Sequence, residues 1–323
     1  MKRISILVPE KAILASLEGT RQLFTQVNIF YKEKGLEPLF DVQLVGLKKT
    51  VKVSGGLFTV NTTQKIDEVK KTDLIIIPAI DGDMQVSLQK NKDFIPWIVQ
   101  QHKKGAEVAS LCLGAFLLAS TGLLKGKKCA THWIAENAFR QMFPDVELVT
   151  EKIITDDSGF YSSGGAFSYL NLILYLIEKY AGREMALLSA KVFAIEIDRE
   201  TQLPFTIFHG QKDHEDNEIK QAQAFIEKNY KEKISVEQLV SMLALSRRNL
   251  ERRFKKATDN TVMEYIQRVK IEAAKQQLEN SRKNVNDVMY EVGYIDNKAF
   301  RNTFKKYTGL SPLEYKSKFM GIA

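Results

Sequence analysis

Residues 1–182 alternate between short runs of consecutive apolar residues and longer stretches in which apolar residues recur every three or four positions. The run TDLIIIPAI contains three consecutive isoleucines, Ile75 to Ile77, which is typical of a parallel strand buried on both faces. Helical spacing is clearest in KAILASLEGTRQLFTQVNIFYKEKG, ending at Gly35, and in AFSYLNLILYLIEKYAG, ending at Gly182. The alternation predicts an α/β domain with a mainly parallel sheet and helices on both faces.

Other segments of the same region extend this alternation. Short apolar runs predict strands at RISILVPE, LFDVQLVG and GKKCATHW, and LFTVNT predicts a short exposed strand after a turn at Ser54-Gly55-Gly56. Helical spacing predicts helices at FIPWIVQQHKKG and ENAFRQMFP, while VELVTEKIITDDSGFYSSGG predicts a strand and a hairpin. The predicted layering is flavodoxin-like, with one sheet between two layers of helices.

The alternation stops at residues 199–217, RETQLPFTIFHGQKDHEDN. This segment contains Pro204, Gly210 and a polar run of mixed charge, a composition typical of boundaries between domains. We therefore predict a linker at 199–217 between a first domain at 1–198 and a second domain at 218–323.

A different pattern occurs twice in the second domain, with a constant offset of 50 residues. The first copy, SRRNLERRFKKATDNTVMEYIQRVK, begins at Ser246, and the second, DNKAFRNTFKKYTGLSPLEYKSKF, begins at Asp296. Leu250 and Phe254 stand four positions apart, as on one helical face, and the same spacing recurs fifty residues later. A constant offset over some twenty residues indicates one supersecondary unit built twice.

Each copy predicts a helix-turn-helix. Ser246 and Asp296 stand where an N-cap belongs, and each is preceded by a shorter amphipathic run, VEQLVSMLAL or VNDVMYEVGYI. The second helix of such a motif enters the major groove of DNA. One basic amphipathic helix is often only a solvated surface, but two copies in the same context favour DNA binding. The second domain is therefore predicted to be all-α, with IKQAQAFIEKNYKEKI as its first helix.

The charge of the chain is concentrated in this second domain. From Glu218 onward there are 21 Lys and Arg against 13 Asp and Glu, and this excess of eight equals the whole net charge of +8. The preceding residues are balanced. An anionic polymer is therefore the expected partner of the second domain alone.

The polar face predicted for each second helix supplies candidate contacts to DNA. Candidates for base edges are Arg247, Arg248, Asn249, Arg252, Asn297, Lys298, Arg301 and Asn302. Candidates for phosphates are Lys255, Lys256, Lys305 and Lys306. The two helices are expected to occupy successive major-groove faces, about one helical turn of DNA apart.

The repeated region resembles the AraC/XylS family of transcription regulators over about residues 219–319. The resemblance is carried by LSRRNLERRFKK, IQRVKIEAAKQQLE, VMYEVGYIDNKAFRNTFKK and YTGLSPLEYKSKF. The first copy departs from the family, which usually has Gly and Pro near Asn260 and Val262, whereas the second copy keeps Gly309 and Pro312. The resemblance implies sequence-specific binding to a double-stranded DNA operator, and we expect a homodimer.

The first domain contains a thiol at a predicted strand-to-helix turn, Ser110-Leu111-Cys112-Leu113-Gly114-Ala115. A nucleophile at such a turn is exposed at the edge of the sheet, where the helix dipole would favour a thiolate. His132 lies at the end of the next predicted strand, GKKCATHW, so a parallel sheet could place it beside Cys112. Cys with His is the minimum set for nucleophilic catalysis.

This turn and the pattern AxLLAxxGLLxGKxxxTHW resemble the ThiJ/PfpI branch of the class I glutamine amidotransferase-like superfamily, over about residues 4–182. More specifically, the chain resembles regulators in which this domain precedes an AraC-type domain and serves as a ligand-binding or interaction module. Two departures argue against catalysis. Ser16, not Glu18, stands where catalytic members have a carboxylate, and Pro78-Ala79-Ile80 replaces the Pro-Gly-Gly of their oxyanion hole.

We therefore expect a sequence-specific transcription regulator whose first domain senses an unidentified small molecule, dimerises, or does both, and which is not an enzyme. Cys112 and His132 would then be vestigial or line a ligand pocket. The alternative is a cysteine hydrolase or deglycase-like enzyme that uses Cys112 and His132 and carries an accessory DNA-binding domain. A third hypothesis is a repressor whose first domain only dimerises.

No cofactor, metal or membrane is expected to take part. The four histidines, at positions 102, 132, 209 and 214, lack the spacing of metal ligands. No run of about eighteen apolar residues is present to span a membrane. Cys112 and Cys129 do not make a disulfide framework, so a cytoplasmic, reducing compartment is expected.

Overall fold

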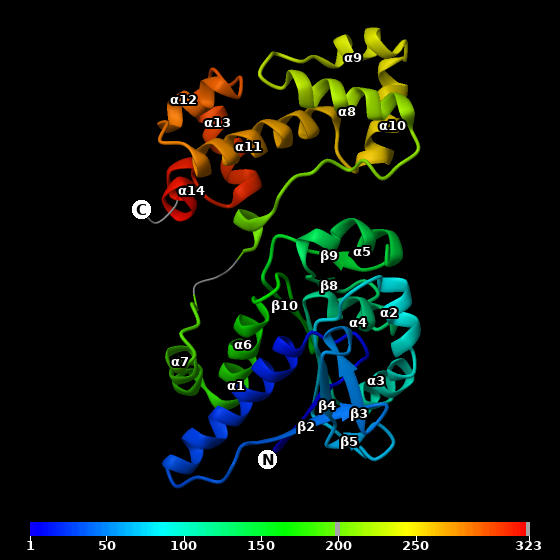
Figure 1. Ribbon diagram of the computed structural model, residues 1–323, viewed down its shortest axis with the longest axis vertical. Helices are drawn as coiled ribbons and strands as arrows, with labels where there is room; N and C mark the ends of the chain where they lie inside the picture. The colour runs from blue at the N-terminus through cyan, green and yellow to red at the C-terminus, as the bar shows by residue number, and fades with distance from the viewer. Residues whose placement is uncertain (198–200, 321–323) are drawn as a thin grey trace. The chain divides into compact units, whose positions relative to one another are not determined.

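The computed structural model describes residues 1–197 and 201–320, and the chain divides into two compact units, Met1–Gln202 and Leu203–Ala323 (Figure 1). The division falls inside the segment 199–217 that the sequence predicts as a linker. Residues 198–200 and 321–323, which include the predicted ends of both domains, lie outside the described residues.

A seven-stranded sheet forms the centre of the first unit, in the order β10-β11-β7-β6-β1-β2-β5. Its strands are β1 (Lys2–Leu7), β2 (Phe40–Gly46), β5 (Gln64–Lys65), β6 (Leu74–Ile77), β7 (Glu107–Leu111), β10 (Ile154–Asp157) and β11 (Phe160–Ser163). The hairpin of β10 and β11 is antiparallel and the other five pairings are parallel. The predicted mainly parallel sheet is confirmed.

The central strand β6 shows why this sheet is covered on both faces. Ile75 and Ile77 pack into one hydrophobic core, and Leu74 and Ile76 pack into the other, because successive side chains point to opposite faces. One face is covered by α1 (Leu14–Glu33), α6 (Tyr169–Ala181) and α7 (Arg183–Val192). The other is covered by α2 (Met84–Asn91), α3 (Phe94–Lys103), α4 (Ala115–Ser120) and α5 (Glu136–Met142).

Two short pairs of strands lie outside the main sheet. β3 (Thr50–Val53) and β4 (Phe58–Asn61) form an antiparallel hairpin around the turn η1 (Ser54–Gly56). β8 (Lys128–Cys129) pairs in parallel with β9 (Glu147–Leu148). The strand predicted in GKKCATHW is confirmed over Lys128–Cys129, but it pairs with β9 outside the main sheet. Side chains replace the ladder there, since the Lys128 N–H donates to Asp157 and the Ala130 N–H donates to Ser162.

The described part of the second unit contains no strand, as predicted for an all-α domain. Its helices are α8 (Asn217–Asn229), α9 (Val236–Leu243), α10 (Arg247–Thr258), α11 (Val262–Asn280), α12 (Val285–Glu291), α13 (Asn297–Thr308) and α14 (Pro312–Phe319), after a short turn η4 (Leu203–Phe205). α8, α9 and α10 share one core with the start of α11, and α12, α13 and α14 share another with its end. The helix α11 thus joins two helix-turn-helix units.

The repeat of 50 residues places equivalent side chains in the two cores. Leu250 and Phe254 of α10 are buried in the first core, and Phe300 and Phe304 of α13 are buried in the second. Both predicted N-caps are confirmed: the Ser246 side chain accepts from the Asn249 N–H, and Asp296 accepts from the Ala299 N–H. We call α10 and α13 the recognition helices.

Candidate functional site

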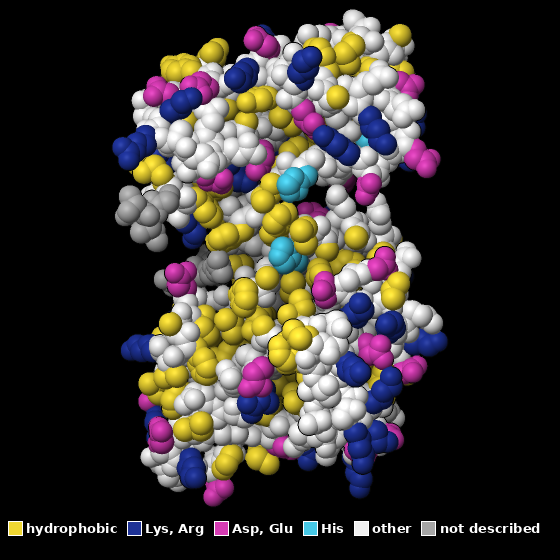
Figure 2. All heavy atoms as spheres, viewed as in Figure 1, with side chains coloured by type: hydrophobic (Ala, Val, Ile, Leu, Met, Phe, Trp, Pro, Cys, Tyr) yellow, Lys and Arg dark blue, Asp and Glu magenta, His cyan; other side chains and the backbone are white. Residues whose placement is uncertain are grey.

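Each recognition helix buries its apolar face and exposes its polar one. Asn249 is half-buried, and the other predicted contacts are exposed, namely Arg247, Arg248, Arg252, Lys255, Lys256, Asn297, Lys298, Arg301, Asn302, Lys305 and Lys306. Figure 2 shows lysine and arginine side chains across the visible face of the second unit. The sequence pattern therefore places these side chains where a nucleic acid could reach them.

Neighbouring side chains already engage part of the polar face of α10. The Arg247 guanidinium pairs with Glu237 of α9 at 2.8 Å and with Glu251 of its own helix at 3.0 Å. Arg252 donates to the Asn249 side chain at 3.0 Å. No hydrogen bond or ion pair within residues 1–197 and 201–320 engages the side chain of Arg248. Arg248 is therefore the least constrained arginine on this helix.

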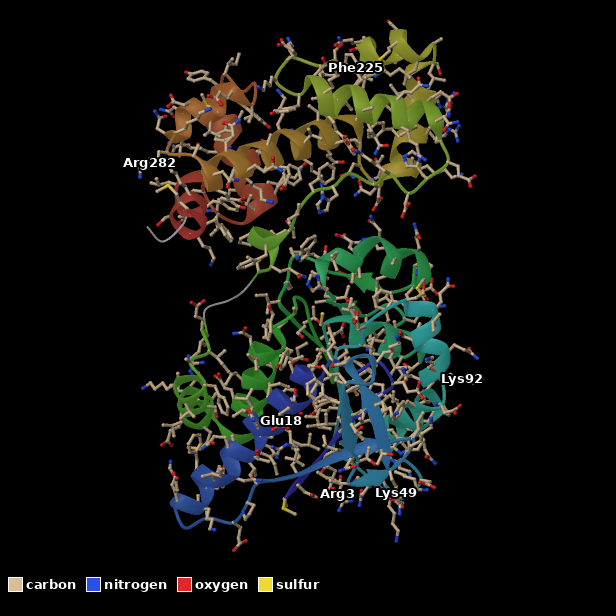
Figure 3. The ribbon with its side chains drawn as sticks, in the orientation of Figure 1. Arg3, Glu18, Lys49, Lys92, Phe225 and Arg282 are labelled. Atoms are coloured by element: carbon tan, nitrogen blue, oxygen red, sulfur yellow. The ribbon has the colours of Figure 1, made fainter. Side chains whose placement is uncertain are left out.

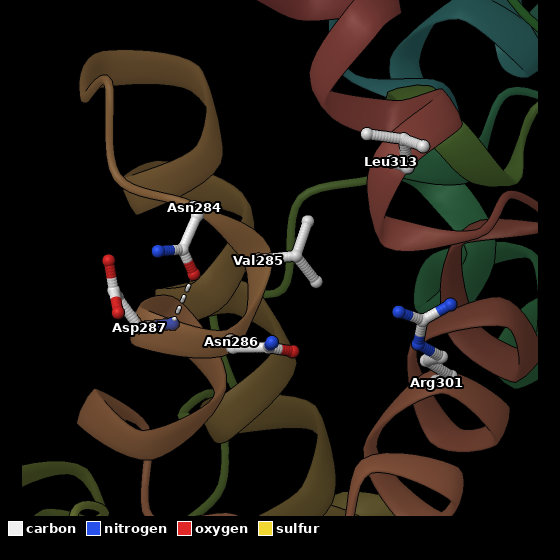
Figure 4. A pocket seen from close by; sticks show the side chains of 6 residues that line it. All are labelled: Asn284, Val285, Asn286, Asp287, Arg301 and Leu313. Carbon is white, nitrogen blue, oxygen red and sulfur yellow. Dashed lines mark hydrogen bonds between the residues drawn. The ribbon is translucent and has the colours of Figure 1, made fainter.

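The polar face of α13 is freer. Asn297 donates to Asn286 of α12 at 2.9 Å. Within the described part of the chain, no hydrogen bond or ion pair engages the side chains of Lys298, Arg301 or Asn302. Arg301 faces a shallow pocket of about 430 Å³, which is shown in Figure 4 and is also lined by Asn284, Val285, Asn286, Asp287 and Leu313.

The four candidate phosphate lysines lie in the last turns of the two recognition helices. Lys255 donates to the Asp259 carbonyl at 2.6 Å and lies 3.4 Å from its carboxylate, so it satisfies the end of its own helix. Lys306 lies over the ring of Tyr307, 5.0 Å from the centroid. Lys256 and Lys305 are exposed.

Arg253 has a structural role that the sequence pattern did not reveal. Its guanidinium donates twice to Asp216, at 2.8 and 2.5 Å, and once to Glu218 at 2.8 Å. Asp216 is also the N-cap of α8, so Arg253 ties the first recognition helix to the start of the unit. The hydrogen bond from Arg253 lowers the pKa of Asp216. The available signal was position, because Arg253 follows Leu250 by three residues and so lies near the buried face.

A second residue that the sequence pattern did not single out, Lys270, connects the two helix-turn-helix units. This lysine of α11 is only 8% exposed, and its ammonium donates to the Gly293 carbonyl at 3.0 Å and the Glu232 carbonyl at 3.4 Å. Burial lowers the pKa of Lys270. Gly293 has φ +74°, and a Cβ there would lie 2.0 Å from the Lys231 carbonyl oxygen. A glycine therefore stands where the backbones of the two helix-turn-helix units come close together.

The predicted strand, sharp turn and helix around Cys112 are confirmed. Cys112 has φ +53° and begins a single turn, η2 (Cys112–Gly114), between β7 and α4. A Cβ on Gly114 would lie 2.4 Å from the Pro78 carbonyl oxygen, so only glycine fits this close approach. The thiol is 3% exposed, and burial raises the pKa of Cys112 to about 11. Burial therefore disfavours the thiolate that the helix dipole was expected to favour.

The ring of His132 is engaged by its own turn. Its Nδ1 accepts from the Ile134 N–H at 3.2 Å, and no hydrogen bond joins its ring to the thiol. The Cys112 carbonyl instead accepts from the buried Thr131 hydroxyl at 3.0 Å. His132 caps a short turn, η3 (Trp133–Ala135), rather than ending a strand of the main sheet, and the hydrogen bond of Thr131 holds this segment next to Cys112. Burial also lowers the pKa of His132.

The backbone donor opposite the elbow is already engaged. The Ala79 N–H donates to the Ser16 hydroxyl at 3.1 Å, and that hydroxyl donates to the Ile13 carbonyl at 2.8 Å. Glu18 lies on α1 (Figure 3) and forms a 2.7 Å ion pair with Arg21, whose hydrogen bond lowers the pKa of Glu18. Ser16 thus occupies the N–H group of Ala79 that an oxyanion hole would offer.

Within the described residues, 1–197 and 201–320, neither unit contains a group of three or more His, Cys, Asp or Glu residues placed to hold a metal ion. In the same residues, no helix is both long and apolar enough to cross a bilayer.

Comparison with known proteins assigns the two units separately. Residues 22–179 match the DJ-1/PfpI family, and residues 239–318 match a helix-turn-helix domain. GbdR of Pseudomonas aeruginosa, an HTH-type transcriptional regulator, is 27% identical over 244 residues, which are 73% of this chain and 65% of GbdR. About a third of GbdR therefore lies outside the match. CdhR of the same species, also an HTH-type transcriptional regulator, is 23% identical over 81% of this chain and 77% of CdhR.

Solved structures share the fold. An AraC family transcriptional regulator from Pseudomonas putida has a TM-score of 0.52 and 16% identity, and the match covers 60% of this chain and 100% of that one. Drosophila melanogaster DJ-1beta has a TM-score of 0.51 and 18% identity, covering 60% of this chain and 98% of that one. The chain therefore carries a DJ-1/PfpI-family domain ahead of a helix-turn-helix domain, and along most of its length it is similar to HTH-type transcriptional regulators.

Proposed function

We propose that this protein is a sequence-specific DNA-binding transcription regulator. The observation that carries the proposal is the pair of recognition helices, which are N-capped in the same way, buried through equivalent side chains and exposed along an Arg-, Lys- and Asn-rich face. The positive charge of the second domain supports it, since phosphate contacts supply most of the affinity of such proteins. The regulators GbdR and CdhR support it by similarity.

In this proposal the two recognition helices enter the major groove about one helical turn apart. Arg248 and Arg252 would contact bases from α10, and Lys298, Arg301 and Asn302 would contact them from α13. Arg247, Asn249 and Asn297 remain candidates. Arg247 and Asn297 must first release a partner in their own chain, and Asn249 must release its hydrogen bond with Arg252. Lysines 255, 256, 305 and 306 would bind phosphates and fix the register without specifying sequence.

We propose that the DJ-1/PfpI-family domain binds a small molecule, dimerises, or does both, and that the protein acts in the cytoplasm. A homodimer would place four recognition helices along the operator. It would bind the operator more tightly than one protomer does, because the second protomer binds at a high effective concentration. The buried thiol and the engaged Ala79 N–H favour a binding role over hydrolysis. Both cysteines are free and buried, in agreement with a reducing compartment.

Capture of sheared DNA from the source organism by the full-length protein, followed by sequencing, tests the proposed function. We expect a few enriched regions that share a motif. A variant with both Arg248→Ala and Lys298→Ala should lose that enrichment, while Lys49→Ala, which removes an exposed lysine of the first unit labelled in Figure 3, should keep it. Even coverage by the unaltered protein would contradict the proposal.

One observation favours a second candidate, a cysteine hydrolase. The left-handed backbone of Cys112 at a strand-to-helix turn is the geometry of a nucleophile elbow. Thiol labelling as a function of pH separates the candidates, with Cys112→Ser as the blank. For a binding domain we expect slow labelling and an apparent pKa for Cys112 of about 11. An apparent pKa well below that of an ordinary thiol, about 8.5, would support the hydrolase.

A further inference from the structure

The segment Leu203–Asp216, which we call the connecting segment, packs against both helix-turn-helix units. At its start Phe205 contacts Phe319 of α14 edge to face, with ring centroids 5.5 Å apart. Three residues later Phe208 contacts Tyr265 near the start of α11, at 5.1 Å. These contacts lie in different cores. Phe319 packs in the core of the second helix-turn-helix unit, and Tyr265 packs in the core of the first helix-turn-helix unit. The connecting segment therefore runs beside α11, the helix that joins the two.

A buried ion pair on α11 holds the backbone of this segment. Lys275 and Glu272 pair at 2.8 Å, and their side chains are only 5% and 14% exposed. The Lys275 ammonium also donates to the Thr206 carbonyl, and Glu272 accepts from the Phe208 N–H at 3.1 Å. Each partner of the ion pair thus has one hydrogen bond to the pair and one to the connecting segment.

The rest of the connecting segment is held by the first helix-turn-helix unit. Gln223 of α8 donates to the Gln211 carbonyl at 2.8 Å, and Asn260 donates to the Gln211 side chain at 3.2 Å. At the end of the segment, Asp216 receives the two hydrogen bonds from Arg253 of the recognition helix α10. The segment is therefore attached to both recognition units and to the helix between them.

Buried charges are stable only when their remaining hydrogen-bonding groups are satisfied. Lys275 and Glu272 reach that condition through the Thr206 carbonyl and the Phe208 N–H, so the pair and the docked segment stabilise each other. We propose that the connecting segment is an intramolecular splint that fixes the orientation of the two recognition helices, with Lys275 and Glu272 as its positioning residues. This inference rests on the proposed DNA-binding function.

The splint has a consequence for regulation. The connecting segment is the part of the chain through which the DJ-1/PfpI-family domain is joined to α8. Any event in the first domain that pulls on this segment would release the buried pair and change the spacing that the recognition helices prefer. The segment thereby connects the DJ-1/PfpI-family domain physically to the half-site spacing that the recognition helices prefer, and so to the operator that the protein selects.

The test measures the binding of full-length protein to a series of duplexes whose two half-sites, taken from the captured motif, differ in spacing by single base pairs. A duplex with one half-site is measured in parallel. We expect unaltered protein to prefer one spacing by about tenfold or more over its neighbours, because a rigid pair of readers engages both sites at only one separation. Phe208→Ala and Lys275→Met should flatten this preference and leave binding to the single half-site within about twofold.

A double variant, Lys275→Met with Glu272→Leu, separates positioning from stability. The single change leaves Glu272 buried without its partner and should lower the unfolding midpoint, whereas the double change should recover most of it. Both changes release the segment, so the splint predicts the same flattened spacing profile in both. Recovery of the profile together with stability would overturn the splint and leave a merely structural ion pair.

The control is Lys283→Met with Glu291→Leu, which removes an exposed ion pair of the same domain that does not contact the segment. Its spacing preference should match that of the unaltered protein, and a flattened profile in this control would overturn the role assigned to Lys275. If the unaltered protein shows no sequence preference on any duplex, the proposed function fails and the splint fails with it. If it binds specifically but Phe208→Ala and Lys275→Met keep its spacing profile, only the splint fails.

Discussion

The two helix-turn-helix units share one framework but differ in where their recognition helices expose charge. The buried pairs Leu250 with Phe254 and Phe300 with Phe304 are equivalent. Glu251, however, is equivalent to Arg301. In the first helix-turn-helix unit, the residue at this position, Glu251, pairs with Arg247. In the second helix-turn-helix unit, the same position carries the exposed Arg301. The repeat therefore keeps the core and not the surface that we propose to contact DNA, so we expect the two half-sites to differ in sequence.

The turns of the two units differ as well. The turn that precedes each recognition helix uses a left-handed residue, which is Ala244 in the first unit and Gly293 in the second. The recognition helices end on left-handed residues, Asp259 and Gly309. The departure of the first copy from the family pattern near Asn260 thus leaves the helix end in place. It substitutes a residue with a side chain for the glycine that this conformation favours.

The largest effect is expected at Gly293. Gly293→Ala should lower the free energy of unfolding by about 3 kcal/mol or more, because a Cβ would meet the Lys231 carbonyl in a left-handed backbone. The matched change Ala244→Gly should stabilise by up to about 1 kcal/mol, since it relieves the same conformation without a clash. Urea unfolding of both variants measures this. Equal and small effects would show that the contact of Gly293 with the Lys231 carbonyl, between the two helix-turn-helix units, is loose.

The next effect concerns DNA affinity. Arg301→Ala and Arg252→Ala should each weaken binding to the selected operator by about 1–3 kcal/mol if these side chains contact bases. Arg247→Ala should cost less than either, because Glu237 and Glu251 already engage that guanidinium. Titration of labelled duplex at fixed salt measures all three. An equal loss on random DNA would reassign a residue from base contact to phosphate contact.

The third effect concerns the hydrogen-bonded pair of Arg253 and Asp216, which we call the clamp. The second helix-turn-helix unit lacks it, because Thr303 stands at the position equivalent to Arg253. Asp216→Ala should destabilise the domain by about 1 kcal/mol or somewhat more through the lost N-cap of α8. The pKa of Asp216 is lowered in the folded state, so its contribution is present above the unfolded pKa of about 3.9 and is lost as pH falls through the folded pKa. The difference between the variant and the parent in unfolding midpoint should therefore shrink below about pH 4. A difference that grows in acid would contradict the clamp.

The smallest effect is expected at the end of the first recognition helix. Asp259→Gly should stabilise by about 0.5–1 kcal/mol, because glycine adopts the left-handed C-cap without strain. The loss of the exposed contact with Lys255 offsets little of this gain. Thermal unfolding measures the change, with Gly309→Asp as the reciprocal variant, which should destabilise. Stabilisation by both changes would show that the two helix ends are not equivalent.

Features that depend on local sequence could be predicted. The consecutive isoleucines at 75–77 indicated a strand buried on both faces. The repeat, together with Ser246 and Asp296, predicted where both recognition helices begin. The helices α2 and α7 were not predicted. For α2 the signal was present, because Asp83 caps it by accepting from the Val86 N–H.

Features that depend on distant parts of the chain could not be predicted. The elbow at Cys112 follows from local sequence, but the burial that raises its pKa depends on packing by other elements. Arg253 belongs to a basic run like its neighbours, and only the fold brings Asp216 within reach of it. The same holds for Lys270, whose acceptors lie 38 and 23 residues away in the sequence.

The most direct test of the double recognition unit is selection of duplexes from a random library by the purified full-length protein, at about physiological salt, followed by sequencing. The account predicts one motif with two different half-sites whose centres lie about one helical turn of DNA apart. Recovery of no motif, with binding that depends only on salt concentration, would contradict it and would leave a basic domain without sequence specificity.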